Sequence, residues 1–189
     1  MNSSTQAPPE SAYPGLVKLG MVQINGQERL LWSASPSDEP HRNVSAQALA
    51  KLTASLTQSP SPALTQVAVA ILLGPQGSFL MTSRPKGKVY EGYWEFPGGK
   101  FEPSESLGEA LKRELHEELG IEILAFEPWC VECVLYPHAL VQLHFCRVTQ
   151  WAGELQMREG QAFAWQTLPL EVSPVLPGAY PVLDLLSRA

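Results

Sequence analysis

Three glutamates at helical spacing are the residues of this sequence best suited to chemistry. Glu114, Glu117 and Glu118 lie at positions i, i+3 and i+4 of a segment with the periodicity of an amphipathic helix, so they share one face. Carboxylates this close repel one another, and a solvated helix gains more from lysines placed among them. Divalent cations remove the repulsion and take oxygen ligands, and Mg²⁺ or Mn²⁺ suits such a set better than Zn²⁺. The spacing therefore favours a metal site over a solvated acidic face.

The net charge of the chain is concentrated around these glutamates. The chain has 189 residues and a net charge of −6, from 13 Lys and Arg against 19 Asp and Glu. Residues 102–122 carry seven Glu and two basic residues, for a net charge of −5. A chain this acidic lacks the basic surface of general nucleic-acid binders, so we expect no polymeric nucleic acid as a partner.

A helix over residues 107–119 is expected to position the acids. Ser106 followed by Glu109 is a capping-box pattern, and Gly120 suits the position where a helix stops. Helical geometry places a row of leucines on a second face and Arg113 off the acidic face. Gly98 and Gly99 precede the helix and would let the backbone approach a ligand, with the Gly98 carbonyl available to a metal; a tight structural turn is the alternative.

Outside this helix, the sequence predicts a mixed α+β arrangement with helices packed on a mixed sheet. Apolar runs and turn residues mark strands at 65–73, 78–84, 93–96, 129–136, 140–149 and 162–166, and residues 178–188 suit a C-terminal helix. The first 64 residues combine a tail at 1–15, a hairpin signal at Asn25-Gly26, an amphipathic helix at 44–57 and a linker at 59–62. We therefore divide the chain into an N-terminal appendage, residues 1–64, and a main domain, residues 65–189.

Other features favour a cytoplasmic protein. Three Cys is an odd number that fits no disulfide scaffold and suits a reducing compartment. The N-terminal residues carry neither the basic nor the apolar region of a signal peptide, and the longest apolar run, 67–73, is too short to span a bilayer. We expect no membrane partner and a monomer or weak dimer.

The segment from Gly98 to Ile121, GGKFEPSESLGEALKRELHEELGI, resembles the Nudix box. Every fixed position of that pattern is present: Gly99, Glu105, Arg113-Glu114-Leu115, Glu117-Glu118 and Gly120-Ile121. The preceding residues WEFPGGK are similar to the lead-in of MutT-type members, and Glu159-Gly160-Gln161 and Trp165 are similar to their later half. The resemblance covers about residues 65–189.

This resemblance implies a fold and an activity. The fold is an α/β/α sandwich around a mixed sheet. The activity is the hydrolysis of a nucleoside triphosphate to a monophosphate and pyrophosphate with Mg²⁺ or Mn²⁺, of the kind that removes 8-oxo-dGTP from the nucleotide pool. The alternatives are a (d)CTP or broad-range pyrophosphohydrolase, a hydrolase of nucleotide sugars or dinucleotides, and a nucleotide-sensing domain without turnover.

The resemblance also implies roles for individual residues. Glu114, Glu117, Glu118 and the Gly98 carbonyl would bind metal, and Glu159 would join them, with an ordinary loop acid as its alternative. Glu114 is the first candidate for the base that deprotonates the attacking water, and Glu118 the second. Arg113 and Glu105 would form a structural pair that orients the loop and the helix, and phosphate binding is the alternative for Arg113.

Base recognition is implied for Arg84 and Phe96, with a place in the core as the alternative for Phe96. Ala179 stands where MutT-type enzymes that read oxidised guanine place an Asn. The missing amide weakens hydrogen-bond discrimination of the base and keeps (d)CTP open as a substrate. Lys86 and Lys88 follow Arg84 in one loop, where they could steer phosphate or lie in solvent.

Overall fold

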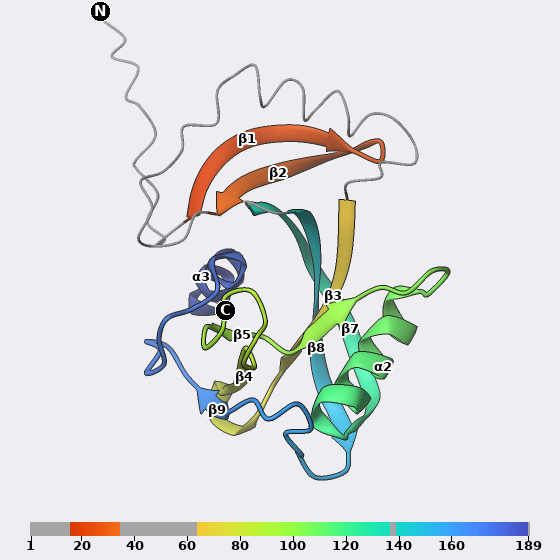
Figure 1. Cartoon of the computed structure of the whole chain (residues 1–189), viewed down its shortest axis with the longest axis vertical. Helices are drawn as coiled ribbons and strands as arrows, with labels where there is room; N and C mark the ends of the chain where they lie inside the picture. The colour runs from red at the N-terminus through yellow and green to blue at the C-terminus, as the bar shows by residue number, and fades with distance from the viewer. Residues whose placement is uncertain (1–15, 35–63, 137–138, 189) are drawn as a thin grey trace, which may run out of the picture.

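The fold is built on a mixed six-stranded sheet. A computed structural model describes residues 16–34, 64–136 and 139–188, shown in Figure 1. The predicted tail at 1–15, helix at 44–57, linker at 59–62 and turn at Pro137-His138 lie outside the described residues. The sheet has the order β1-β2-β7-β8-β3-β6, with parallel β2·β7 and β3·β8 pairs and antiparallel pairs elsewhere. Its strands are β1 Leu16–Ile24, β2 Gln27–Ala34, β3 Leu64–Leu72, β6 Gly98–Lys100, β7 Glu122–Tyr136 and β8 Ala139–Ala152.

A smaller sheet and two helices complete the described fold. Strands β4 Phe79–Ser83, β5 Trp94–Glu95 and β9 Phe163–Gln166 form a three-stranded sheet in the order β5-β4-β9. Helix α2 spans Leu107–Leu119 as predicted, and α3 spans Tyr180–Ser187 after a 3₁₀ turn at Pro177–Ala179. The mixed α+β fold is confirmed. None of the helices in the described part of the chain is long and apolar enough to cross a membrane.

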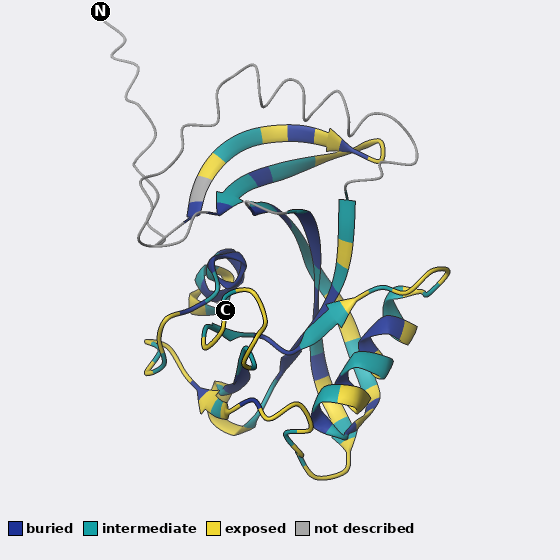
Figure 2. Ribbon diagram, viewed as in Figure 1, coloured by how far each residue is buried: buried dark blue, intermediate teal, exposed yellow. Residues whose placement is uncertain are grey.

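Two apolar cores lie on opposite faces of the large sheet. On one face, leucines of α2 pack on β3 and β8; on the other, α3 and the small sheet pack on alternate residues of the same strands (Figures 1 and 2). Along β8, for example, Phe145 belongs to the α3 side and Cys146 to the α2 side. Neighbouring residues of a strand face opposite sides, so strands buried on both faces are apolar throughout, as in the second half of β3, residues 68–72.

Strands β7 and β8 extend beyond the predicted boundaries. The sequence predicts a strand start at residue 129, whereas β7 begins at Glu122 and contains Pro128, a residue that is unusual inside a strand. Register shifts near Ala125 and between Pro128 and Cys130 accommodate the extra residues as irregularities in an otherwise continuous pair with β8.

The N-terminal hairpin is part of the large sheet. Asn25 and Gly26 adopt positive φ angles of 50° and 74° and connect β1 to β2, as predicted. Strand β2 then pairs with β7, with Leu31 opposite Cys133. Leu31 and Cys133 also share an apolar cluster with Val22, Ile24 and Leu140. The hairpin therefore has no separate core, and the division at residues 64 and 65 stays a prediction.

Candidate active site

Helix α2 presents the three glutamates through its termini and its apolar face. The Ser106 side chain accepts a hydrogen bond from the Glu109 amide, and the Glu109 carboxylate accepts one from the Ser106 amide. The helix ends at Gly120, whose φ of 71° is left-handed. Leu111, Leu115, Leu119 and Ala110 are fully buried against the sheet. This packing fixes the rotation of the helix and directs Glu114, Glu117 and Glu118 away from the leucine core.

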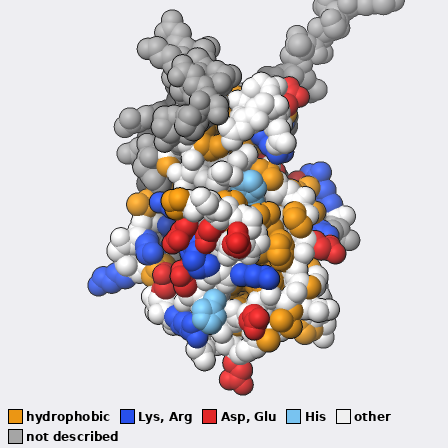
Figure 3. All heavy atoms as spheres, turned by 90° about the vertical axis from the view of Figure 1, so that its right-hand side faces the viewer, with side chains coloured by type: hydrophobic (Ala, Val, Ile, Leu, Met, Phe, Trp, Pro, Cys, Tyr) orange, Lys and Arg blue, Asp and Glu red, His pale blue; other side chains and the backbone are white. Residues whose placement is uncertain are grey.

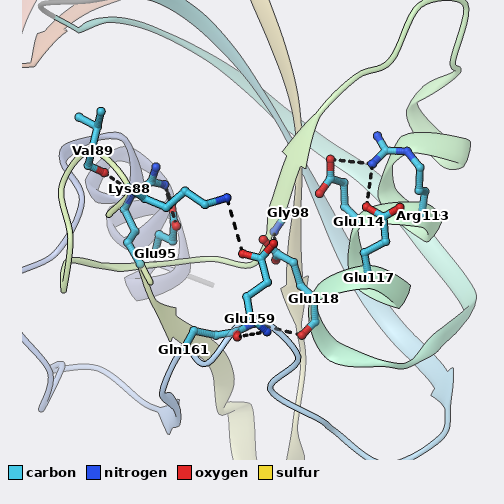
Figure 4. Close-up of polar contacts among 11 residues, drawn as sticks. Lys88, Val89, Glu95, Gly98, Arg113, Glu114, Glu117, Glu118, Glu159 and Gln161 are labelled. Atoms are coloured by element: carbon cyan, nitrogen blue, oxygen red, sulfur yellow. Dashed lines mark hydrogen bonds and ion pairs between the residues drawn. The ribbon is translucent and has the colours of Figure 1, made fainter. Parts of the chain in front are cut away.

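Strand β6 approaches the acidic face of α2 closely at Gly99, which has no side chain. A Cβ on Gly98 would lie 2.1 Å from the Ala68 carbonyl oxygen, and a Cβ on Gly99 would lie 2.1 Å from the Glu114 carboxylate carbon. The Gly98 amide donates a hydrogen bond of 3.1 Å to Glu118 Oε2 (Figure 4). Gly99 thus lets the strand approach Glu114, and Gly98 lets it pair closely with β3.

Arg113 links the loop before α2 to the acidic face. Its guanidinium forms two hydrogen bonds with Glu105, at 2.6 and 2.8 Å, and one of 2.9 Å with the Lys100 carbonyl. Nη1 also donates to Glu114 at 2.9 Å and to Glu117 at 3.3 Å (Figure 4). The expectation that Arg113 lies off the acidic face is wrong for its guanidinium, because the long side chain extends back to that face.

The Arg113 contacts also set the charge of its partners. The hydrogen bonds from Arg113 lower the pKa of Glu105 to about 2. Burial raises the pKa of Glu114, and the Arg113 hydrogen bond opposes that rise. The pair between Arg113 and Glu105 therefore exists as an ion pair, while its role in orienting the loop stays a prediction.

The loop after β8 brings Glu159 to the end of α2. The last carbonyls of a helix have no partner within the helix. Here the Arg158 amide and the Gln161 side chain each donate to the Glu118 carbonyl at 3.1 Å, and the Arg158 guanidinium donates to the His116 carbonyl at 2.8 Å. Glu159 lies between these anchoring residues, and its carboxylate points to the same region as that of Glu118 (Figure 4).

The carboxyl group of Glu118 is strongly perturbed by its surroundings. Burial raises its pKa to about 8, with further upward contributions from the charges of Glu95, Glu114 and Glu159, and the Gly98 hydrogen bond opposes the shift. Four carboxylates from three segments therefore act on one another here. Figure 3 shows acidic side chains gathered with basic ones on the face of the molecule that carries α2.

The donor set fits a hard divalent cation in its chemistry. Carboxylate and carbonyl oxygens are the ligands that Mg²⁺ and Mn²⁺ prefer, and a buried, mutually repelling set gains most from a bound cation. In the described residues, no three His, Cys, Asp or Glu side chains gather closely enough to hold an ion as they stand. Arg113 accounts for part of this, since it draws Glu114 and Glu117 to itself.

Of the two candidate base-binding residues, Phe96 lies in the core and Arg84 is bound to Glu95 and to the loop backbone. Phe96 is 4% exposed and packs against Phe79 and Phe145, with ring centroids 5.7 and 6.1 Å apart, so it lies in the core. Arg84 forms two hydrogen bonds of 2.7 Å with Glu95 and donates one of 2.6 Å to the Val89 carbonyl.

Two site residues have a weak signal in the sequence. Glu95 lies in WEFPGGK next to buried Phe96, yet its charge acts on the acidic group, the name used here for Glu114, Glu117, Glu118 and Glu159. Burial raises the pKa of Glu95, and Arg84 opposes the rise. Only the alternation of sides along the short strand β5 could have indicated this. Lys88, whose Nζ lies 3.7 Å from Glu159, follows a turn, where spacing predicts no direction for the side chain. Ala179 is buried in the 3₁₀ turn before α3.

Comparison with known proteins identifies the family. The NUDIX domain matches residues 63–186. The chain belongs to the Nudix family. It is 35% identical over 101 residues to the 8-oxo-dGTP diphosphatase of Buchnera aphidicola subsp. Schizaphis graminum, covering 53% of this chain and 75% of that protein. It is 38% identical over 118 residues to the CTP pyrophosphohydrolase of Escherichia coli K12, covering 61% and 87%. Among solved structures, the E. coli ORF135 protein is 35% identical with a TM-score of 0.58, covering 67% of this chain and 90% of that one.

The Nudix match also separates the hairpin from the rest of the sheet. It begins at residue 63, next to β3, and includes every residue of the acidic group. Strands β1 and β2 precede it, although they continue the same sheet. This Nudix hydrolase therefore has a sheet two strands wider than the part that the family match contains.

Proposed function

We propose that this Nudix hydrolase cleaves a nucleoside triphosphate into a nucleoside monophosphate and pyrophosphate. The observation that carries the proposal is the proximity of Glu118, on α2, to Glu159, on a loop anchored to the end of α2, with the Gly98 amide of β6 bound to the Glu118 carboxylate. Similarity to an 8-oxo-dGTP diphosphatase and a CTP pyrophosphohydrolase supports this reaction class.

The residues of the site divide the chemical work. Glu114, Glu117, Glu118, Glu159 and the Gly98 carbonyl would hold Mg²⁺ or Mn²⁺. When bound, the cation neutralises phosphate charge and lowers the pKa of a coordinated water. Glu114, or else Glu118, accepts the proton of the water that attacks phosphorus, and pyrophosphate leaves. The Gly98 amide orients the Glu118 carboxylate, and Arg113 orients Glu114 against the Glu105 loop.

For the nucleobase we propose an oxidised purine such as 8-oxo-dGTP, with (d)CTP as a second candidate. Ala179 favours the second candidate, because a buried methyl group offers a base edge no hydrogen bond. Arg84 can contribute to either only with the guanidinium edge that Glu95 and Val89 leave available.

Pyrophosphate release across a panel of nucleotides tests the proposal. With Mg²⁺, we expect turnover of triphosphates and little turnover of ADP-ribose or dinucleoside polyphosphates. Glu114→Gln should reduce kcat by about 10³-fold or more while the protein stays folded, because both metal binding and proton transfer are affected. Glu122→Gln, an exposed acid at the start of β7, is the matched control and should be near wild type. Nucleotide binding without turnover would indicate a sensing domain instead.

A further inference from the structure

Hydrogen bonds within the loop between β4 and β5 fix its conformation beside the acidic group. The Arg84 amide donates to the Tyr93 carbonyl at 2.8 Å and the Gly92 amide donates back to the Arg84 carbonyl at 3.0 Å, which closes the base of the loop. Within the loop, the Gly87 amide donates to Glu91 Oε2 at 2.9 Å, and Arg84 Nε donates to the Val89 carbonyl. These bonds fix the backbone on both sides of Lys88.

From this loop, Lys88 extends to the acidic group (Figure 4). Its Nζ lies 3.7 Å from Glu159 Oε2. The Lys88 charge also acts on Glu95, where it opposes the rise in pKa that burial causes. Glu159 in turn raises the pKa values of Glu114 and Glu118. Lys88 therefore supplies positive charge at the edge of the acidic group that Arg113 does not reach.

The ion pair between Lys88 and Glu159 is easily exchanged. The two side chains are 57% and 39% exposed, and exposed pairs of this kind contribute little stability. A cation bound at Glu159 repels the ammonium group, and the triphosphate that accompanies it offers a stronger anionic partner. A lysine side chain is flexible enough to change partners while its backbone stays in place.

We propose that Lys88 is a substrate-binding residue, which leaves Glu159 and binds the phosphates of the nucleotide when metal occupies the acidic group. The proposal rests on the function proposed above and assigns the phosphates of that substrate a contact outside the Nudix box. Lys86, two residues earlier in the same loop, takes no part in the ion pairs of the described residues and lies in solvent. The two lysines, which the sequence does not distinguish, thus have different roles.

The exchange predicts opposite effects on two affinities. Removing the ammonium frees Glu159, so metal alone should bind about two- to fivefold more tightly to Lys88→Met. The same change removes a charge-assisted contact with phosphate, so the KM for triphosphates should rise about tenfold, with kcat changed less than about threefold. If Lys88 only stabilised the fold of the loop, its removal would not tighten metal binding while raising the KM for triphosphates.

The experiment compares Lys88→Met and Lys88→Arg with Lys86→Met as the matched control. Mn²⁺ affinity without nucleotide is measured by electron paramagnetic resonance. KM is measured for CTP, GTP and 8-oxo-dGTP, and product inhibition is measured with pyrophosphate. We expect Lys88→Met to raise KM by the same factor for all three bases and to weaken pyrophosphate inhibition. Lys88→Arg should keep the KM and the pyrophosphate inhibition near their wild-type values, and Lys86→Met should match the wild type in both.

Three results would overturn the proposal. One is a rise in KM for a single base with unchanged pyrophosphate inhibition, which would place Lys88 at the nucleobase. Another is equal behaviour of Lys88→Met and Lys86→Met. The third is weaker Mn²⁺ binding by Lys88→Met. If the wild type hydrolyses no triphosphate, the proposed function fails, while the Mn²⁺ and pyrophosphate titrations still decide the role of Lys88.

Discussion

At the scale of single residues, the carboxylates of the site differ in whether a positively charged side chain lies beside them. Arg113 contacts Glu114 and Glu117, and Lys88 contacts Glu159. The Glu118 carboxylate accepts a hydrogen bond from the Gly98 amide and takes part in no ion pair within the described residues, and burial raises its pKa to about 8. A bound cation would therefore strongly favour the charged form of Glu118.

The first prediction concerns the pH dependence of metal binding. Because the raised pKa of about 8 leaves the Glu118 carboxyl mostly protonated at pH 7, a metal ion must displace that proton. The apparent Mg²⁺ affinity should thus be about tenfold weaker at pH 7 than at pH 9 and should level off above pH 8. Calorimetric titration in two buffers of different ionisation enthalpy measures the proton released. An affinity that is constant from pH 6 to 9, with no proton release, would contradict the assignment of Glu118 as a metal ligand with a raised pKa.

A second prediction uses the close approach of Gly99 to Glu114. In Gly99→Ala the new methyl would meet the Glu114 carboxylate at 2.1–2.3 Å, and the flexible side chain can move aside at little cost in stability. We expect kcat/KM to fall about 10²-fold from misplacement, with less than about 1 kcal/mol lost in the free energy of unfolding. Gly108→Ala is the control, since its methyl would meet only the Phe126 ring, at 3.1 Å. Similar losses of activity in both variants would count against a positioning role of Gly99.

At the scale of secondary structure elements, local signals predicted the parts of the site on α2. The capping box, the leucine repeat and Gly120 set the helix to the residue, because each acts within one or two turns of chain. The hydrogen bonds that bring Glu159 to α2 join residues more than 40 positions apart, and no local pattern encodes them. The resemblance, not the spacing, predicted Glu159.

The pairing of β2 with β7 likewise could not be predicted from local sequence patterns. The hairpin was predicted from Asn25-Gly26, but a hairpin pattern does not say which edge accepts it. In the structure, Trp32 Nε1 donates a 2.9 Å hydrogen bond to Glu132 Oε2, a contact across 100 positions of sequence. Glu132 is a charged residue within an otherwise apolar part of β7. Its partner is 100 positions away, so no local pattern in the sequence indicates it.

A third prediction tests this contact between β2 and β7. Burial raises the pKa of Glu132, and the Trp32 hydrogen bond opposes the rise. In Trp32→Phe the half-buried carboxylate loses this donor, so the free energy of unfolding should fall by about 1–2 kcal/mol at pH 8. A protonated Glu132 is cheaper to bury, so the loss should diminish as pH falls. Glu132→Gln keeps an acceptor without the charge and should stay within about 0.5 kcal/mol of the wild type. Urea unfolding measures both, and equal stability of Trp32→Phe would contradict a structural role for the bond.

At the scale of the whole molecule, the large sheet is the frame that joins the site to the N-terminal hairpin. Site residues come from α2, β5, β6 and the loops after β4 and β8, while β1 and β2 lie at the opposite edge of the large sheet from β6 (Figure 1). The hairpin contributes Val22, Ile24 and Leu31 to a cluster with Cys133 and Leu140 of the Nudix domain. It therefore stabilises the strands that carry the domain without touching the acidic group.

A truncation tests whether the hairpin belongs to the folded core. Removing residues 1–34 uncovers Cys133 and Leu140 and discards five apolar side chains of the described residues that are 0–5% exposed, those of Leu16, Val22, Ile24, Leu31 and Ala34. Each buried aliphatic side chain contributes about 1.5–3 kcal/mol, against a total stability of about 5–15 kcal/mol. The thermal midpoint should therefore fall by at least about 10 °C. A chain starting at residue 16 keeps both strands and is the control. Below its midpoint, the shorter chain should keep the wild-type KM, since the hairpin supplies no site residue; an unchanged midpoint would make the hairpin an appendage after all.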